Sequence, residues 1–149
     1  MPRSRTTSFF TLGYQSHTQS SLLTLLTANQ VAVLVDVRQN PISRKKGFSK
    51  NSLEKNAARM GITYLHFPCL GTPPQIRSFY GRTGNVKQTL KKYEIYLSSR
   101  TKCLESLVQT VTSKQFCLLC LESDYTFCHR SVIAQRLTEM TGCPPIHLK

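Results

Sequence analysis

Residues 31–38 read VAVLVDVR, a nearly unbroken run of apolar, mostly β-branched side chains that ends in a carboxylate and a guanidinium. Such a run is typical of a strand buried on both faces, as in a parallel sheet. Asp36 and Arg38 lie two positions apart, so along a strand they point the same way. The stretch therefore predicts a buried strand that presents two charged side chains at its carboxyl end.

Apolar patterns on both sides of this run predict further elements. Strands are expected at residues 9–12, 62–67 and 116–121, with an edge strand at 144–148. Asn51 and Glu54 resemble a capping box at the start of a helix. The apolar side chains that mark helices are Leu22, Leu25 and Leu26; Leu53, Ala57 and Met60; Val86, Leu90, Tyr93 and Leu97; Leu104, Leu107, Val108 and Val111; and Ile133, Leu137 and Met140.

The alternation of strands and helices predicts an α/β fold. We expect a single three-layer domain over residues 9–149, in which a mainly parallel sheet of four to five strands has helices on both faces. Residues 68–85 contain several Gly and Pro residues and are expected to form a long loop. Residues 1–8 are basic and are expected to be a flexible N-terminus.

Composition narrows the class of protein. A chain of 149 residues with 40% hydrophobic side chains can bury a core without disulfides or a structural metal. No apolar stretch approaches a membrane span, and no signal-peptide core follows the N-terminus, so we expect a soluble cytoplasmic protein that does not contact membranes. The six Cys residues lie mostly in apolar runs and are expected to be buried and reduced.

The charge of the chain is concentrated in its middle. The net charge is +13, and residues 38–102 hold 14 Lys and Arg against Glu54 and Glu94 alone. Such asymmetry favours a polyanionic partner, either nucleic acid or a phosphorylated small molecule. A solvated basic surface is the alternative interpretation.

Ligands of open parallel sheets bind at the carboxyl ends of the strands, and the polar residues of this chain accumulate there. A basic loop, residues 43–49, follows the second strand, and a polar segment, residues 122–131, follows the fourth. The residues expected to bind the ligand are Tyr14, Arg38, Ser43, Arg44, Lys45, Arg77, Arg130 and Ser131.

Residues 128–131 read CHRS and begin the last predicted helix, where free N–H groups and the helix dipole favour an anion. The same field would lower the pKa of the Cys128 thiol and make it a nucleophile. The candidate catalytic residues are Cys128, His129, Glu122 and Asp36. Alternatively, Cys128 is a packed residue, and Arg130 pairs structurally with Glu122 or Asp36.

Metal binding is a third interpretation of this region. Cys120, Cys128, His129 and His147 supply suitable ligand types but do not show a recognised zinc spacing. Cys117 and Cys120 form a CxxC pattern, but strand residues three apart point to opposite faces, so this pattern is rejected as a metal motif. No cofactor is expected.

Several segments together resemble the bacterial and archaeal family named domain of unknown function 488. The resemblance covers nearly the whole chain after the first eight residues, and it implies an α/β fold and a cytosolic prokaryotic protein without implying an activity. The segments that carry it are residues 11–14 (TLGY), 35–38 (VDVR) with Pro41, 43–50 (SRKKGFSK), 61–64 (GITY), 70–73 (LGTP) with Arg77, 119–122 (LCLE), 128–131 (CHRS) and 147–148 (HL).

A fainter similarity is to rhodanese and cysteine-phosphatase folds, which share an Asp-Val-Arg strand end and a Cys-loop-Arg-Ser helix start. Those families place the catalytic cysteine at the strand end, which corresponds to Cys120 here. Nine residues separate Cys120 from Arg130, a longer loop than those families use.

These observations leave three hypotheses about function. The leading hypothesis is that the crevice at the strand ends binds a phosphate-bearing ligand, with nucleic acid or a nucleotide as the favoured ligand. Arg38, Arg44, Lys45 and Arg130 would contact phosphate, while Asp36 would help to position them, together with Glu122. The alternative is a cysteine-dependent enzyme that uses Cys128 or Cys120 in sulfur or phosphoryl chemistry. The third is a metal-binding module.

Overall fold

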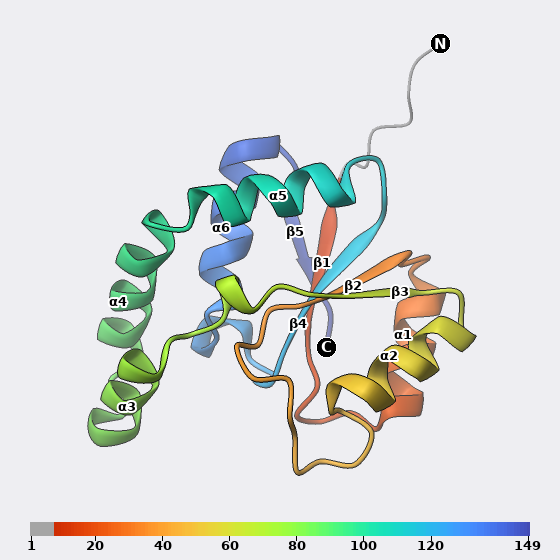
Figure 1. Ribbon diagram of the computed structural model, residues 1–149, viewed down its shortest axis with the longest axis horizontal. Coiled ribbons are helices and arrows are strands. Elements are labelled where there is room, and N and C mark those ends of the chain that lie inside the picture. The colour runs from red at the N-terminus through yellow and green to blue at the C-terminus, as the bar shows by residue number, and fades with distance from the viewer. Residues whose placement is uncertain (1–7) are drawn as a thin grey trace.

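Five parallel strands form one sheet in the order β3-β2-β4-β1-β5, with helices on both faces (Figure 1). The computed structural model describes residues 8–149, so most of the predicted flexible N-terminus lies outside the described residues. The predicted α/β fold and its parallel sheet are confirmed. The strands are β1 (Phe9–Gly13), β2 (Val33–Asp36), β3 (Thr63–His66), β4 (Phe116–Cys120) and β5 (Pro145–His147).

Helices α1 and α2 cover one face of the sheet, while α4, α5 and α6 cover the other (Figure 1). In the described part of the chain, no helix combines the length and apolar character that a membrane span requires. The helices are α1 (Gln19–Ala28), α2 (Lys50–Arg59), α3 (Pro74–Thr83), α4 (Val86–Ser98), α5 (Thr101–Val111) and α6 (Arg130–Thr141), with 3-10 turns η1 (Pro68–Leu70) and η2 (Tyr125–Phe127).

Strand β2 belongs to both halves of the core. Val33 and Val35 pack with the side chains of α4, α5 and α6, whereas Leu34 packs with those of α1 and α2. All three are buried, and each fully buried aliphatic side chain contributes about 1.5–3 kcal/mol to folding. Strand β4 is buried on both faces in the same way, and Cys117 and Cys120 lie on opposite faces as predicted.

Part of the segment expected to be a loop, residues 68–85, is instead helical. After η1, helix α3 begins at Pro74, because a proline in the first turn has its φ angle fixed near the helical value and needs no N–H partner. None of the residues of α3 is buried. Ile76 of this helix packs against the core but stays partly exposed, and the Gly and Pro residues around the helix had indicated a loop.

The start of α2 also differs from the prediction. The helix begins at Lys50 with Ser49 as its N-cap, so Asn51 and Glu54 do not form a capping box. The Ser49 hydroxyl instead accepts a hydrogen bond from the backbone N–H of Ser43, at 3.0 Å. This contact closes the base of the loop that joins β2 to α2.

Gly13 permits a close approach at the end of β1. A Cβ atom at this position would lie 1.7 Å from the carbonyl oxygen of Glu122. Only glycine therefore allows the segment after β4 to cross directly over the end of β1. This crossing fixes where the residues that follow β4 stand relative to the sheet.

Two of the six cysteines are oxidised, contrary to the expectation that all are reduced. Cys69 in η1 and Cys103 in α5 form a disulfide with a Cα–Cα distance of 6.4 Å. The bond ties the segment after β3 to the helical layer beside it. The expectation failed because the two residues are 34 positions apart in the chain and only the packing of α5 brings them together.

We expect the Cys69–Cys103 bond to stabilise the protein. Closing a loop of this length lowers the conformational entropy of the unfolded chain, which raises the free energy of unfolding by about 3–4 kcal/mol. The double variant C69S/C103S should lose that much free energy of unfolding in a urea titration. Dithiothreitol should lower the Tm of the parent protein and leave the Tm of the double variant unchanged; equal Tm values for the parent with and without reductant would contradict the expectation.

Candidate functional site

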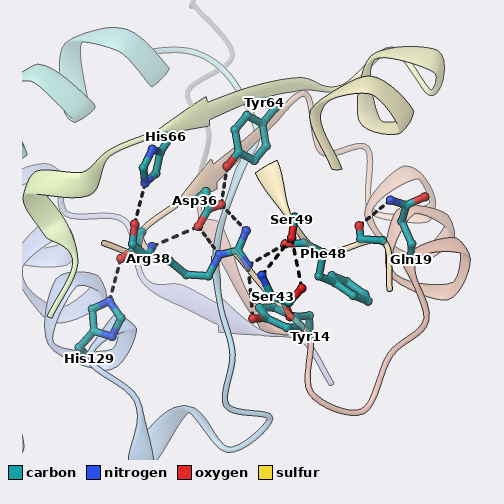
Figure 2. A network of polar contacts seen from close by, with 12 residues as sticks. Tyr14, Gln19, Asp36, Arg38, Ser43, Phe48, Ser49, Tyr64, His66 and His129 are labelled. Carbon is teal, nitrogen blue, oxygen red and sulfur yellow. Dashed lines mark hydrogen bonds and ion pairs between the residues drawn. The ribbon is translucent and has the colours of Figure 1, made fainter. Parts of the chain in front are cut away.

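The polar residues predicted to surround a crevice do gather at the carboxyl edge of the sheet, but they form two separate groups. The first group surrounds Asp36 and Arg38 at the end of β2 (Figure 2). The second follows β4 and comprises Cys120, Glu122 and the start of α6. The carbonyl of Val37 lies between them and accepts a hydrogen bond from the second group.

Asp36 and Arg38 form a buried, bidentate ion pair. Arg38 Nε and Nη2 donate to the two Asp36 carboxylate oxygens at 2.8 and 2.6 Å, and Nη1 donates to the Phe48 carbonyl at 2.7 Å. The Tyr64 hydroxyl donates to the same carboxylate. Figure 2 shows these donors converging on Asp36. The pair thus joins β2, β3 and the loop before α2.

The ion pair controls the charge states around it. Burial by itself would lower the pKa of Arg38, but the hydrogen bonds and charge of Asp36 outweigh burial and raise the pKa above its ordinary value. The pKa of Tyr64 is raised by burial and then by the negative charge of Asp36. Both side chains therefore keep their protons at neutral pH and can donate to the carboxylate.

Tyr14 completes the first group. The Arg38 guanidinium lies 5.1 Å from the centre of the Tyr14 ring, and that ring stacks on Phe48 at 4.6 Å. Arg38 also donates to the Tyr14 hydroxyl at 3.3 Å. All of the contacts described for the Arg38 guanidinium are thus made inside the protein, and its side chain is only 7% exposed. Contact between Arg38 and a phosphate stays a prediction.

Arg130 is likewise directed inward. Its side chain is completely buried, and it donates to the Glu122 carbonyl, to the Ser123 carbonyl at 3.3 Å and to Thr11 Oγ1 at 3.3 Å. Its partner at residue 122 is the backbone carbonyl, not the carboxylate that the alternative interpretation assumed. Arg130 therefore holds the turn after β4 against β1.

The basic loop between β2 and α2 has one cation bonded to the protein and others directed outward. Lys45 Nζ donates to the Gln15 carbonyl at 2.6 Å and to the Tyr14 carbonyl at 3.3 Å. Arg44 is exposed. Ser43 binds Ser49, as described above. Lys46 of this loop is exposed as well.

The second group places two thiols beside an imidazole. Cys120 Sγ lies 3.6 Å from His129 Nδ1, and Cys128 Sγ lies 3.8 Å from the same nitrogen. Glu122 Oε2 is 3.5 Å from Cys120 Sγ. The His129 Nε2 atom lies 2.9 Å from the Val37 carbonyl oxygen, which can only accept, so Nε2 carries a proton.

The surroundings of Cys128 oppose the activation of its thiol that the helix start suggested. The side chain is 1% exposed, and burial, followed by the neighbouring Cys120, raises the pKa of Cys128 well above its ordinary value. The positive field of His129 lowers it only in part. Desolvation outweighs the helix dipole here because the thiol faces the core and not the solvent at the helix end.

His129 is polarised by the groups around it. Burial opposes its charged form, but the Cys128 thiol, the Val37 carbonyl and the Glu122 carboxylate raise its pKa above the ordinary value. Its ring and that of Tyr93 form a T-shaped pair, with ring centres 5.1 Å apart. The imidazole is thus fixed on three sides and directs Nδ1 toward the thiols.

His147 does not belong to this group. It contacts Thr11 Oγ1 through Nδ1 at 2.6 Å and stacks on Tyr125 with ring centres 3.5 Å apart. The potential metal ligands that lie together are Cys120, Cys128 and His129. Ser131 is also occupied locally, since its hydroxyl donates to the Cys128 carbonyl at 2.8 Å.

A pocket of about 270 Å³ opens above the second group. Glu122, His129 and Arg77 are among the residues that line it. Sequence reasoning missed most of the lining, because its residues read as the apolar stripe of α4 or as part of the loop that is in fact α3. The remaining lining residues are Thr72, Tyr80, Val86, Thr89, Leu90, Tyr93 and Phe127.

Comparison with known proteins identifies the family of the chain. The chain matches the family model described as Domain of unknown function DUF488 over residues 18–137. The protein belongs to the DUF488 family. A search of curated proteins and a search of solved structures gave no match. The fainter similarity to rhodanese and cysteine phosphatases is not shown, and the family description assigns no activity.

We expect the Asp36–Arg38 pair to be essential for the stability of this DUF488 domain. The D36N variant leaves a buried guanidinium without its counter-charge and should lose about 3–5 kcal/mol in urea unfolding. Y64F removes one hydrogen bond to the carboxylate and should lose about 1 kcal/mol. The exposed Glu54 serves as a control, because E54Q should change little; a similar loss in D36N and E54Q would show that the pair is dispensable.

We expect alkylation of the native chain to spare Cys128. With iodoacetamide near neutral pH and peptide mapping by mass spectrometry, the half-buried Cys143 should react faster than the buried Cys117 and Cys128. In denaturant the three rates should converge. Faster labelling of Cys128 than of Cys143 in the native state would restore the activated-thiol interpretation.

Proposed function

We propose that this DUF488 protein binds a phosphate-bearing ligand, in the first place a single strand of nucleic acid, across the pocket between α3, α4 and the end of β4. The observation that carries the proposal is the position of Arg77. It is exposed, it lines the pocket, and the partner found for it is the neutral side-chain oxygen of Gln39, at 2.8 Å. Its charge is therefore available to a phosphate, which a guanidinium can bind in bidentate fashion.

Helices α3 and α4, whose residues line the pocket, supply further positive charge. Helices α3 and α4 pack against each other and stand at one side of the molecule (Figure 1). Residues 74–98 carry five cations against Glu94, and all five are exposed. Such a surface favours a polyanion over a single phosphate group. The cations are Arg77, Arg82, Lys87, Lys91 and Lys92.

Aromatic side chains at the pocket favour nucleobases as the other part of the ligand. Phe127 is 58% exposed and Tyr80 is 46% exposed, although both are large and largely apolar. Both line the pocket. Exposed aromatic rings beside cations are the usual surface for single-stranded nucleic acids, whose bases stack without regard to sequence.

The proposal changes which residues contact the ligand. Arg77 and Arg44 are exposed and suited to phosphate, while Arg38 and Arg130 are assigned to the framework because their guanidinium groups bond to the protein. Asp36 serves that framework as well. Lys45 contributes charge to the rim, although its amine is hydrogen-bonded to the backbone.

Binding of fluorescent single-stranded oligonucleotides, followed by anisotropy against salt, tests the proposal. Affinity should fall steeply as salt rises, because bound cations displace counterions from the phosphates. R77Q should weaken binding to different sequences alike and should reduce the slope of log K against log salt by about 1.

Arg59 offers a matched control for this experiment. It is an exposed arginine on α2, outside the pocket, and it also donates to a neutral amide oxygen, that of Asn56, at 3.3 Å. R59Q should bind as the parent protein does. The proposal is wrong if the parent protein fails to bind any oligonucleotide at low salt, or if R59Q and R77Q lose affinity equally.

A further inference from the structure

We propose that Cys120, Cys128 and His129 bind a Zn²⁺ ion whose remaining coordination position faces the pocket. Their two sulfur atoms and the Nδ1 atom lie within 4.8 Å of one another. In a tetrahedral zinc site with bonds of about 2.0–2.3 Å, neighbouring sulfur and nitrogen ligands are about 3.6 Å apart. The two sulfur–nitrogen distances here are 3.6 and 3.8 Å, so one ion can reach all three with little movement.

The surroundings of His129 are those of a metal ligand. Its Nε2–H donates to the Val37 carbonyl, which leaves the lone pair of Nδ1 directed toward the two sulfur atoms. Histidines that bind metals are usually fixed by a hydrogen bond of this kind from the opposite ring nitrogen. Tyr93 packs against the ring and restricts its rotation.

The sulfur ligands are also supported. The backbone N–H of Arg130 donates to Cys128 Sγ at 3.5 Å, and such a donor stabilises the negative charge of a thiolate. Cys120 is held at the end of β4, the strand between β2 and β1. One ligand therefore comes from a rigid strand and the other two from the segment that leads into α6.

The type of ligand selects the metal. Two sulfurs and one imidazole favour Zn²⁺, whereas Mg²⁺ and Ca²⁺ require oxygen ligands. Binding forms two zinc–sulfur bonds and one zinc–nitrogen bond, and the two thiols release their protons to solvent. The charge of the ion is then balanced by two thiolates, so no net charge is left unpaired among these buried groups.

The fourth position is open toward the pocket. Cys120 and Cys128 are buried, but His129 and Glu122 line the pocket. Glu122 Oε2 lies 3.5 Å from Cys120 Sγ, beside the three ligands and not among them. Three protein ligands with a free position are typical of zinc sites that bind water or substrate, and Glu122 is placed to accept a proton there. The zinc site does not rest on the proposed binding of nucleic acid.

Metal analysis of the full chain tests this inference. Protein purified from zinc-supplemented medium should retain about one zinc per chain after desalting. C120A and C128A should each weaken zinc binding more than about 100-fold. C117A is the matched control, because Cys117 lies on the same strand but on its opposite face and should leave zinc content unchanged.

Cobalt substitution keeps the test independent of whether a variant folds. Co²⁺ added to the metal-free parent chain should give thiolate charge-transfer absorption in the near ultraviolet and the intense visible bands of tetrahedral cobalt. C117A should give the same spectrum. The inference would be overturned if the parent chain showed neither bound zinc nor this absorption, or if the variants C120A and C128A retained zinc. Rapid alkylation of Cys120 in zinc-treated parent protein would overturn it as well.

Glu122 tests the open position. E122A should retain its zinc, because the carboxylate is not one of the three ligands; loss of zinc in E122A would show a closed site with four protein ligands and would overturn this part of the inference. R77Q should retain zinc while losing affinity for oligonucleotides. If the zinc is present and the parent binds no oligonucleotide, the proposed function fails and the zinc site stands.

Discussion

The ion pair between Asp36 and Arg38 is the constraint on which the rest of the site depends. It is buried at the end of β2 and joins that strand to Tyr64 of β3 and to the loop before α2. Exchange of such a pair for apolar side chains is often neutral for stability, whereas removal of one partner is costly. In this protein the ion pair serves to position the chain, because it fixes the path of the backbone just after β2.

That path provides the support for the second group of residues. The Val37 carbonyl, between Asp36 and Arg38, holds the imidazole of His129 and thereby directs it toward both thiols. Arg130, which follows His129 in the chain, holds the turn after β4 over Gly13. Two buried arginines thus supply the framework, and the proposed ligand would contact the exposed cations of α3, α4 and the basic loop.

The proposed zinc ion and the proposed ligand would share one pocket. Because two thiolates balance the charge of the ion, a phosphate would interact with it through the open coordination position, whereas Arg77 supplies the unbalanced positive charge. Apolar and aromatic lining reduces access of water and strengthens such attractions.

The sequence alone determined the sheet and most of the helices, because VAVLVDV, FCLLC and the apolar stripes of α1, α4, α5 and α6 are local patterns that burial imposes on neighbouring residues. It also located the polar segments at the strand ends. Helix α3 escaped prediction because none of its residues is fully buried and the Gly and Pro residues around it indicated a loop. Only the tertiary structure decided that Arg38 and Arg130 turn inward, that Cys69 pairs with Cys103, and that Tyr93 meets His129, since each depends on how elements distant in sequence pack together.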